Sequence, residues 1–280
     1  MLILHQFRHE LLKLFGKKRT YLGFLIFLVV QNCIIMAFKA TEAEDFTMRL
    51  LTGNGYPAEE FLSALTIATV VLVPLAVFLL PLYVSLVGGE AVAKETEDGT
   101  LRMVLCRPIS RGRLLLLKWL AGVVFCFALV ACLALLGLLF ARFWFPWKGL
   151  FVWLPDQDIF SVYTANDGLR QYLLSNLLLI VQGVSILSLG FMFSCFDMKP
   201  AAATILALSF VFANFILQSL PYFESMKEWW FTSQLGLWQF VFAQPIPWWR
   251  IGQSLSLLFG YNVTFLVIGV TAFYIRDIKT

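Results

Sequence analysis

Residues 88–118 read GGEAVAKETEDGTLRMVLCRPISRGRLLLLK and form the long, densely charged stretch of a chain that otherwise consists mostly of apolar runs. The stretch carries ten charged side chains of both signs, and an apolar run lies on each side of it. Charged side chains are costly in hydrocarbon. These residues therefore face water or a protein partner, and they divide the apolar part of the chain into two groups.

The stretch contains ordered breaks that predict a short helix inside it. Asp98 and Gly99 form a turn signal that ends a first helix, and the reversal of the chain at Gly99 favours a left-handed backbone there. Thr100 can cap a second helix over residues 101–106, because its hydroxyl can accept an unpaired backbone N–H. Pro108 then ends that helix, since it has no N–H. An ordinary solvated connector, which most such loops are, needs neither break.

The composition places the rest of the chain in a membrane. Of its 280 residues, 60% are hydrophobic and 14% are charged, and the mean hydropathy is +0.82, which is too apolar for a soluble domain. Crossing about 30 Å of hydrocarbon takes about 20 helical residues. We expect one membrane domain over residues 1–280, with a bend at Pro74 and Pro81 in the second span. Six runs are long enough to span, near residues 21–38, 61–87, 114–140, 172–196, 201–220 and 254–275.

Lysine and arginine are distributed unevenly between the connections. With the N-terminus and residues 88–118 inside the cell, the inner segments hold 14 basic residues and the outer segments hold 7, which is the bias that sets orientation in membranes. The net charge of +4 is thus a topology signal and not a nucleic-acid surface. We expect a multi-pass protein of the cell membrane with both termini in the cytoplasm. Residues 1–19 predict an amphipathic helix in the headgroup plane.

The outer segments differ in character. Residues 39–60 are acidic and rich in turn residues, and they predict a plain external loop. Residues 141–171 and 221–253 together hold eight of the nine tryptophans, and tryptophan prefers the boundary between water and lipid. Residues 221–253 are apolar enough to enter the outer leaflet without crossing it. They form either short interfacial helices or an aromatic belt that only anchors the protein.

Few groups in the sequence could carry chemistry. Hydrolytic motifs and the phosphate-binding motif G-x-x-x-x-G-K-[ST] are missing. His5 and His9 have the spacing of a metal pair, but they lack a third ligand nearby, so we expect no metal site. Lys118 is the single charge inside a span, which leaves no buried ion pair or proton relay for an ion-coupled carrier. Polar span residues that could line a path, or could hydrogen-bond between helices, include Asn176, Gln182, Asn214 and Gln218.

The charged stretch resembles the cytoplasmic loop that follows the second span in ABC-2-type transporter permeases. The resemblance consists of E-x-x-x-G-T-L, then P-x-x-R after six residues, and a lysine at the membrane entry after six more. It is carried by Glu95, Gly99, Thr100, Leu101, Pro108, Arg111 and Lys118. The order of two spans, a loop and four spans extends the likeness over nearly the whole chain, which looks most similar to the NosY-like permeases.

This resemblance implies an all-α integral membrane protein with six transmembrane helices, an N-terminal interfacial helix and a cytoplasmic coupling helix between spans two and three. In that family the loop docks on a separate subunit that binds ATP and Mg, so the seven residues become candidates for ATPase coupling. The chain would then be a transport subunit and not an enzyme, without a cofactor of its own. Its partners would be two ATPase copies, a second or related permease, and membrane lipid.

A bundle without charges and a tryptophan-rich outer side favour export of a hydrophobic or amphiphilic substrate, because a charged solute would lose its hydration there. Two other functions remain open at this point. One is a non-transporting scaffold subunit of a larger membrane complex. The other is a secondary carrier, which the lack of charges inside the spans disfavours.

Overall fold

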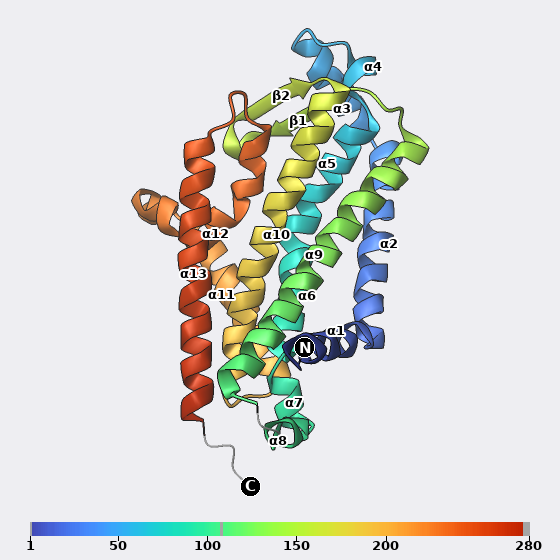
Figure 1. The fold of residues 1–280 in the computed structure, drawn as a ribbon. Coiled ribbons are helices and arrows are strands. Elements are labelled where there is room, and N and C mark those ends of the chain that lie inside the picture. The colour runs from blue at the N-terminus through green and yellow to red at the C-terminus, as the bar shows by residue number, and fades with distance from the viewer. Residues whose placement is uncertain (1, 107–108, 277–280) are drawn as a thin grey trace.

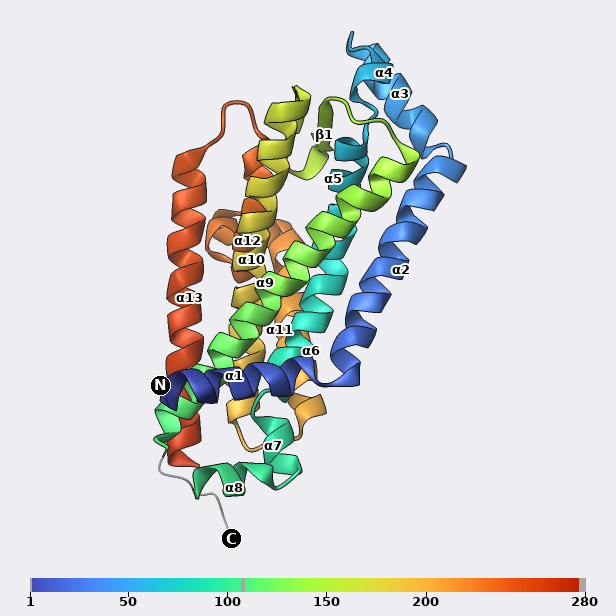
Figure 2. The same ribbon diagram turned by 45° about the vertical axis from the view of Figure 1, so that its right-hand side comes forward.

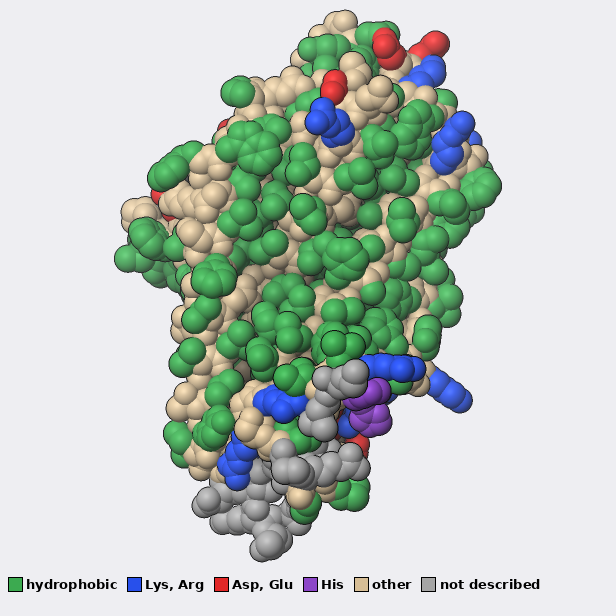
Figure 3. All heavy atoms as spheres, in the orientation of Figure 1, with side chains coloured by type: hydrophobic (Ala, Val, Ile, Leu, Met, Phe, Trp, Pro, Cys, Tyr) green, Lys and Arg blue, Asp and Glu red, His purple; other side chains and the backbone are tan. Residues whose placement is uncertain are grey.

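The computed structural model describes residues 2–106 and 109–276 and shows long helices that run side by side (Figure 1). Six helices are long and apolar enough to cross a membrane. They are α2 (Lys18–Ala40), α5 (Ala64–Pro74) continued by α6 (Leu80–Glu90), α9 (Arg111–Trp144), α10 (Ala165–Cys195), α11 (Pro200–Ser219) and α13 (Trp248–Ile275). On the face seen in Figure 3, apolar side chains cover the middle of the bundle and charged side chains gather toward its two ends. The predicted class, a helical membrane protein with six spans, is confirmed.

The second span contains a π-helical turn, Leu75–Leu79, which joins α5 to α6. Pro74 and Pro81 border this turn, and neither has an N–H to continue the α-helical pattern. In a π-helix the carbonyl of Ala76 would accept the backbone N–H five residues later, but that residue is Pro81, which has no N–H. The side-chain Nε2 of Gln182 donates to that carbonyl at 2.8 Å. The structure thus has a π-helical turn where the sequence predicted a bend, and a neighbouring helix satisfies the freed backbone group.

α10 is the central helix of the bundle and contacts α6, α9, α11 and α13. Glycines allow α6 and α10 to approach closely. A Cβ atom at Gly88 would lie 2.7 Å from the carbonyl oxygen of Leu187, and one at Gly190 would lie 3.1 Å from that of Ser85. Any larger residue at Gly88 would push the two backbones apart. The charged stretch therefore leaves the membrane from a helix that is packed tightly on the centre of the bundle.

One end of the bundle carries three short helices: α1 (Leu2–Phe15), α7 (Ala93–Glu97) and α8 (Thr100–Leu105). α13 ends on the same side, and α1 runs crosswise to the spans (Figure 2). Leu4 and Leu12 on α1 are exposed, whereas Phe15 packs on Phe125 of α9 with ring centroids 6.1 Å apart. This is the arrangement expected of an amphipathic helix whose outer apolar side chains enter lipid.

The opposite end corrects the prediction of a plain loop over residues 39–60. Two helices form there, α3 (Ala43–Gly53) and α4 (Ala58–Phe61). The prediction treated the acidic residues as loop signals, but Glu44 and Asp45 lie in the first turn of α3, where negative charge stabilises a helix. Leu51 of α3 is fully buried against Ala58 and Phe151. Tertiary contact therefore supports a helix that composition alone did not indicate.

The two tryptophan-rich segments contain more structure than the sequence indicated. Residues 141–171 include an antiparallel hairpin whose pairing runs from Leu150 opposite Tyr163 to Leu154 opposite Ile159. Its strands are β1 (Leu150–Leu154) and β2 (Ile159–Tyr163), joined by a 3-10 turn, Pro155–Gln157. Between α11 and α13 lie α12 (Phe231–Leu235) and 3-10 segments at Pro221–Trp229 and Gly236–Phe242. Trp238 is 1% exposed, so this segment is short helices packed into the bundle and not only an aromatic belt.

Candidate functional site

The charged stretch forms a compact unit at the end of the bundle that carries α1. α7 and α8 are joined by a turn at Gly99, and the unit is attached to the spans through a small apolar cluster. Val92 and Leu101 are buried in that cluster together with Phe191 of α10 and Phe273 of α13. The unit therefore packs on the ends of two spans that are far from it in the sequence.

A side chain from α10 accepts hydrogen bonds from the backbone N–H groups at the beginning of α7. The hydroxyl oxygen of Ser194 accepts the backbone N–H of Val92 at 2.8 Å and that of Ala93 at 2.9 Å. The first N–H groups of a helix have no partner within the helix. Because Ser194 lies on α10, this contact fixes where α7 begins relative to the central span.

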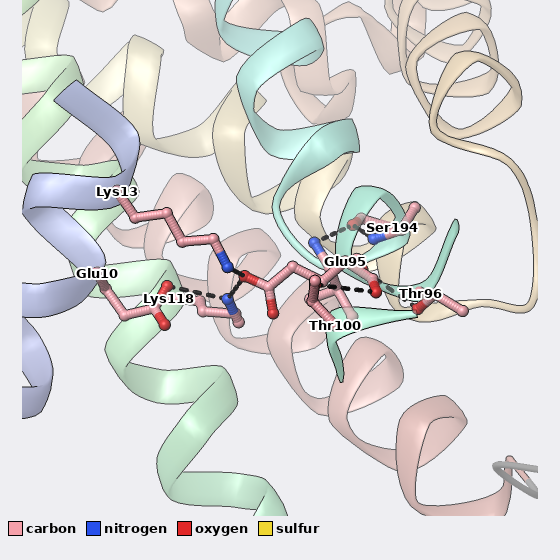
Figure 4. Close-up of polar contacts among 9 residues, drawn as sticks. Glu10, Lys13, Glu95, Thr96, Thr100, Lys118 and Ser194 are labelled. Atoms are coloured by element: carbon pink, nitrogen blue, oxygen red, sulfur yellow. Dashed lines mark hydrogen bonds and ion pairs between the residues drawn. The ribbon is translucent and has the colours of Figure 1, made fainter. Parts of the chain in front are cut away.

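Glu95 is the centre of an ionic cluster that joins α1, α7 and α9 (Figure 4). Its Oε1 accepts hydrogen bonds from the ammonium groups of Lys13, at 2.5 Å, and of Lys118. Lys118 also pairs with the carboxylate of Glu10 at 2.9 Å. The side chains of Glu95 and Lys118 are only 8% and 3% exposed. α1, the charged loop and the third span are thus held together by one group of charges.

The charge state of Glu95 follows from these neighbours. Burial alone would raise the pKa of Glu95, but the ammonium groups of Lys118 and Lys13 outweigh burial and lower the pKa below its usual value. Glu95 is therefore ionised at neutral pH. Its second oxygen, Oε2, is buried without a partner among the described residues.

This cluster corrects the expectation that the chain offers no buried ion pair. The expectation considered charges inside the spans only, and Lys118 was the single one. Its partners come from outside the spans, on α1 and α7, which the sequence separates from it by 108 and 23 positions. The cluster joins α1, α7 and the beginning of α9, which meet at one end of the bundle (Figure 2). It does not form a chain of charges across the membrane.

The other residues that carried the resemblance have distinct positions. Gly99 has a φ of +70°, so the predicted left-handed backbone is confirmed. α8 begins at Thr100, whose hydroxyl donates to the carbonyl of Glu95 at 3.3 Å; that it also caps α8 remains a prediction. Leu101 is 2% exposed, and Arg111 Nη1 donates to the carbonyl of Tyr274 at 3.3 Å. Pro108 lies outside the described residues.

Glu95, Lys118 and Leu101 are therefore buried, and a docking subunit would meet other side chains. Lys94, Glu97 and Asp98 lie on the outer side of α7, where Lys94 pairs with Glu97 at 2.7 Å and with Asp98 at 3.2 Å. Met103 of α8 is 68% exposed. The outer surface of the unit is thus a charged turn next to an exposed apolar side chain.

The four polar span residues make hydrogen bonds within the bundle. Asn176 and Asn214 donate to carbonyls of their own helices, at Tyr172 and Phe210. Gln182 donates to Ala76, as described above, and Gln218 Oε1 accepts from the hydroxyls of Thr232 and Ser233. These contacts are typical of helix packing. That the four line a path remains a prediction.

With this geometry in view, the comparison with known families is decisive. The family model described as ABC-2 family transporter protein matches residues 6–241. The chain belongs to the ABC-2 family. The match extends from α1 through α12 and includes the ionic cluster and the charged unit, while α13 lies beyond it. The search of curated proteins finds no match.

Sequence reasoning missed three residues of the site in this ABC-2 protein: Glu10, Lys13 and Ser194. Glu10 and Lys13 lie three positions apart on the polar side of α1, which is a signal for one charged face but not for its partner. Ser194 follows a run of apolar residues and gives no local signal of its own. Each of these roles depends on a contact between segments that are distant in the chain. Groups of three or more His, Cys, Asp or Glu that could hold a metal ion are not found among the described residues.

Proposed function

We propose that this protein is the permease subunit of an ATP-driven exporter, powered by a separate ATPase subunit that binds ATP and Mg. The observation that carries the proposal is the attachment of the α7–α8 unit to the spans. A solvated connector has no need of a buried ionic cluster, whereas a docking element must transmit force. Membership of the ABC-2 family supports the same function.

The contacts of the unit define a route for that force. Pressure on the outer surface at Met103 and Glu97 would reach α9 and α1 through Glu95 and Lys118, and would reach α10 and α13 through the apolar cluster around Leu101. A buried cluster with fixed partners resists deformation, so the unit moves together with these helices. Closure of the ATPase would then shift the permease as a rigid body between inward-facing and outward-facing states.

The test uses an exposed residue of the unit. Met103→Asp puts a charge on a side chain that is 68% exposed, so the fold of the permease should be unchanged. We expect it to weaken co-purification with the ATPase subunit and to lower ATP-dependent transport. Phe46→Asp is the matched control, because Phe46 is 52% exposed at the opposite end of the bundle. Equal ATPase binding in both variants would refute docking at α8.

The same experiment separates the remaining functions. A scaffold subunit would bind its partners but show no ATP-dependent movement of any substrate in proteoliposomes. A secondary carrier would transport without an ATPase and would depend on an ion gradient. The buried ionic cluster consists of ion pairs among α1, α7 and the beginning of α9, at one end of the bundle, so it does not favour such a carrier.

The finer parts of the proposal are supported by the sequence resemblance and by the distribution of charge along the chain. We place the chain nearest the NosY-like permeases, in an assembly of two permeases with twelve spans and two ATPase copies. The charged unit and both termini face the cytoplasm of a cell membrane. The substrate is hydrophobic or amphiphilic, because the spans carry so few charges. Stimulation of the ATPase by a small hydrophilic ion, without a response to any amphiphile, would refute this substrate class.

A further inference from the structure

A small cavity of about 70 Å³ opens beside the junction of α1 and α2. Its walls come from the end of α1, the beginning of α2, the last turns of α6 that lead into the charged unit, and parts of α7 and α9. Leu86 and Val87 supply apolar walls, and Lys17 and Arg19 supply positive charge. The cavity therefore combines basic and apolar groups at the level of the interfacial helix.

The charges around this cavity are not balanced. Four cations line it, Lys13, Lys17, Arg19 and Lys118, against three carboxylates, Glu10, Glu90 and Glu95. Each carboxylate is already used: Glu90 pairs with Arg19 at 2.5 Å, and the other two belong to the cluster around Lys118. Among the residues that the structure describes, Lys17 has no ion pair.

Lys17 is half-buried, and this burial lowers the pKa of its ammonium group. Glu90 and Glu95 favour the charged form of Lys17, but they do not outweigh burial. An anion placed in the cavity would therefore stabilise this partly desolvated cation.

The position of the cavity identifies the source of that charge. α1 exposes Leu4 and Leu12, as an interfacial helix does, and α2 exposes Tyr21, Leu22 and Leu25 directly after the cavity. These apolar side chains face lipid. The group present at high concentration at this depth is the phosphate of a phospholipid, whose acyl chains would lie along the exposed part of α2.

We propose that this cavity binds the phosphate of an anionic phospholipid headgroup, with Lys17 as its principal ligand. Bound lipid would join the junction of α1 and α2 to the end of α6, directly before the charged unit. Lipid composition would then influence how firmly that unit is held. Binding is a property of the permease alone, so this inference is independent of the ATPase and of the transported substrate.

The experiment measures lipid-dependent thermal stability of the full-length permease in detergent. Dioleoylphosphatidylglycerol is the probe, and dioleoylphosphatidylcholine and inorganic phosphate are the comparators. We expect phosphatidylglycerol to raise the melting temperature of the wild type, and Lys17→Gln to require about fivefold more of this lipid for the same rise. Lys17→Arg should retain the response. Lys18→Gln is the matched control, because Lys18 is exposed and does not line the cavity.

Three results would overturn the proposal. Equal loss in Lys17→Gln and Lys18→Gln would indicate a diffuse surface charge. An equal response to phosphatidylcholine would remove the anionic selectivity, and an equal, Lys17-dependent response to inorganic phosphate would make this a site for the free ion. Should Lys17→Gln fail to fold, Val87→Phe carries the same test, because it narrows the cavity without changing any charge; an unchanged lipid response in that variant also overturns the proposal.

Discussion

Replacing Glu95 by alanine removes the centre of the ionic cluster, and its effect can be worked out from the contacts. The hydrogen bond to Lys118, whose side chain is 3% exposed, contributes about 1.5–3 kcal/mol as a bond between charged groups. The pair with Lys13, whose side chain is 37% exposed, is screened by solvent and contributes less than about 1 kcal/mol. In Glu95→Ala, Lys118 still has its ion pair with Glu10. The destabilisation therefore stays below the penalty of about 3–5 kcal/mol for an uncompensated buried charge. We expect a loss of about 2–3 kcal/mol in the docking of α7 and α8.

Hydrogen–deuterium exchange of the backbone amides of residues 93–105 measures this loss directly. A change of about 2–3 kcal/mol makes opening of the unit about 30 to 150 times more frequent, and exchange should accelerate by that factor. Glu97→Ala is the control, because Glu97 is exposed and, among the described residues, its ion-pair partner is Lys94 on the same helix. Exchange within twofold of the wild type in Glu95→Ala, or equal acceleration in both variants, would refute the role of the cluster.

A double variant tests the electrostatic explanation itself. In Glu95→Leu combined with Lys118→Met, the remaining Glu10 and Lys13 lie three positions apart on α1 and can pair with each other. Replacing a buried ion pair by apolar side chains is often neutral. The double variant should therefore exchange more slowly than Glu95→Ala. Exchange faster than in that single variant would contradict this account.

Three further predictions follow from the same region. Gly99→Val should destabilise the turn by about 1–3 kcal/mol because φ is +70°, whereas Gly99→Asn should be tolerated; equal melting temperatures for both would contradict the backbone argument. In a cysteine-free background, an impermeant thiol reagent should label Asn54→Cys but not Glu97→Cys in intact cells; labelling of the latter would reverse the orientation. Because the pKa of Glu95 is lowered in the folded state, its stabilisation is present above the unfolded value of about 4.3 and is lost as the pH falls through the folded value. The difference in melting temperature between wild type and Glu95→Ala should therefore be constant from about pH 8 to pH 5 and shrink below about pH 4; a decrease between pH 8 and pH 6 would contradict this.

The location of the candidate site was predictable from the sequence, but the contacts that its residues make were not. Asp98-Gly99 and the charges around it indicated an ordered turn, because the glycine conformation depends on local sterics. Thr100 shows the limit of such reasoning. The sequence indicated that its hydroxyl could accept an N–H, but it did not indicate that the hydroxyl donates to the carbonyl of Glu95. Local sequence indicates which groups are available, and their neighbours decide which hydrogen bonds form.

By itself the sequence determined six membrane spans, the N-terminal helix and the position of the charged stretch, because each depends on the pattern of hydrophobicity over a single continuous segment. Only the tertiary structure decided that Glu95 is buried, that Glu10 and Lys13 of α1 reach it, and that Lys17 faces a cavity. The formation of α3 also depended on tertiary contact, since this helix packs on the hairpin through Leu51 and Phe151. Contacts between charges distant in the chain leave no periodic signal. They form because a buried charge must find its counter-ion wherever the packing of the helices brings one within reach.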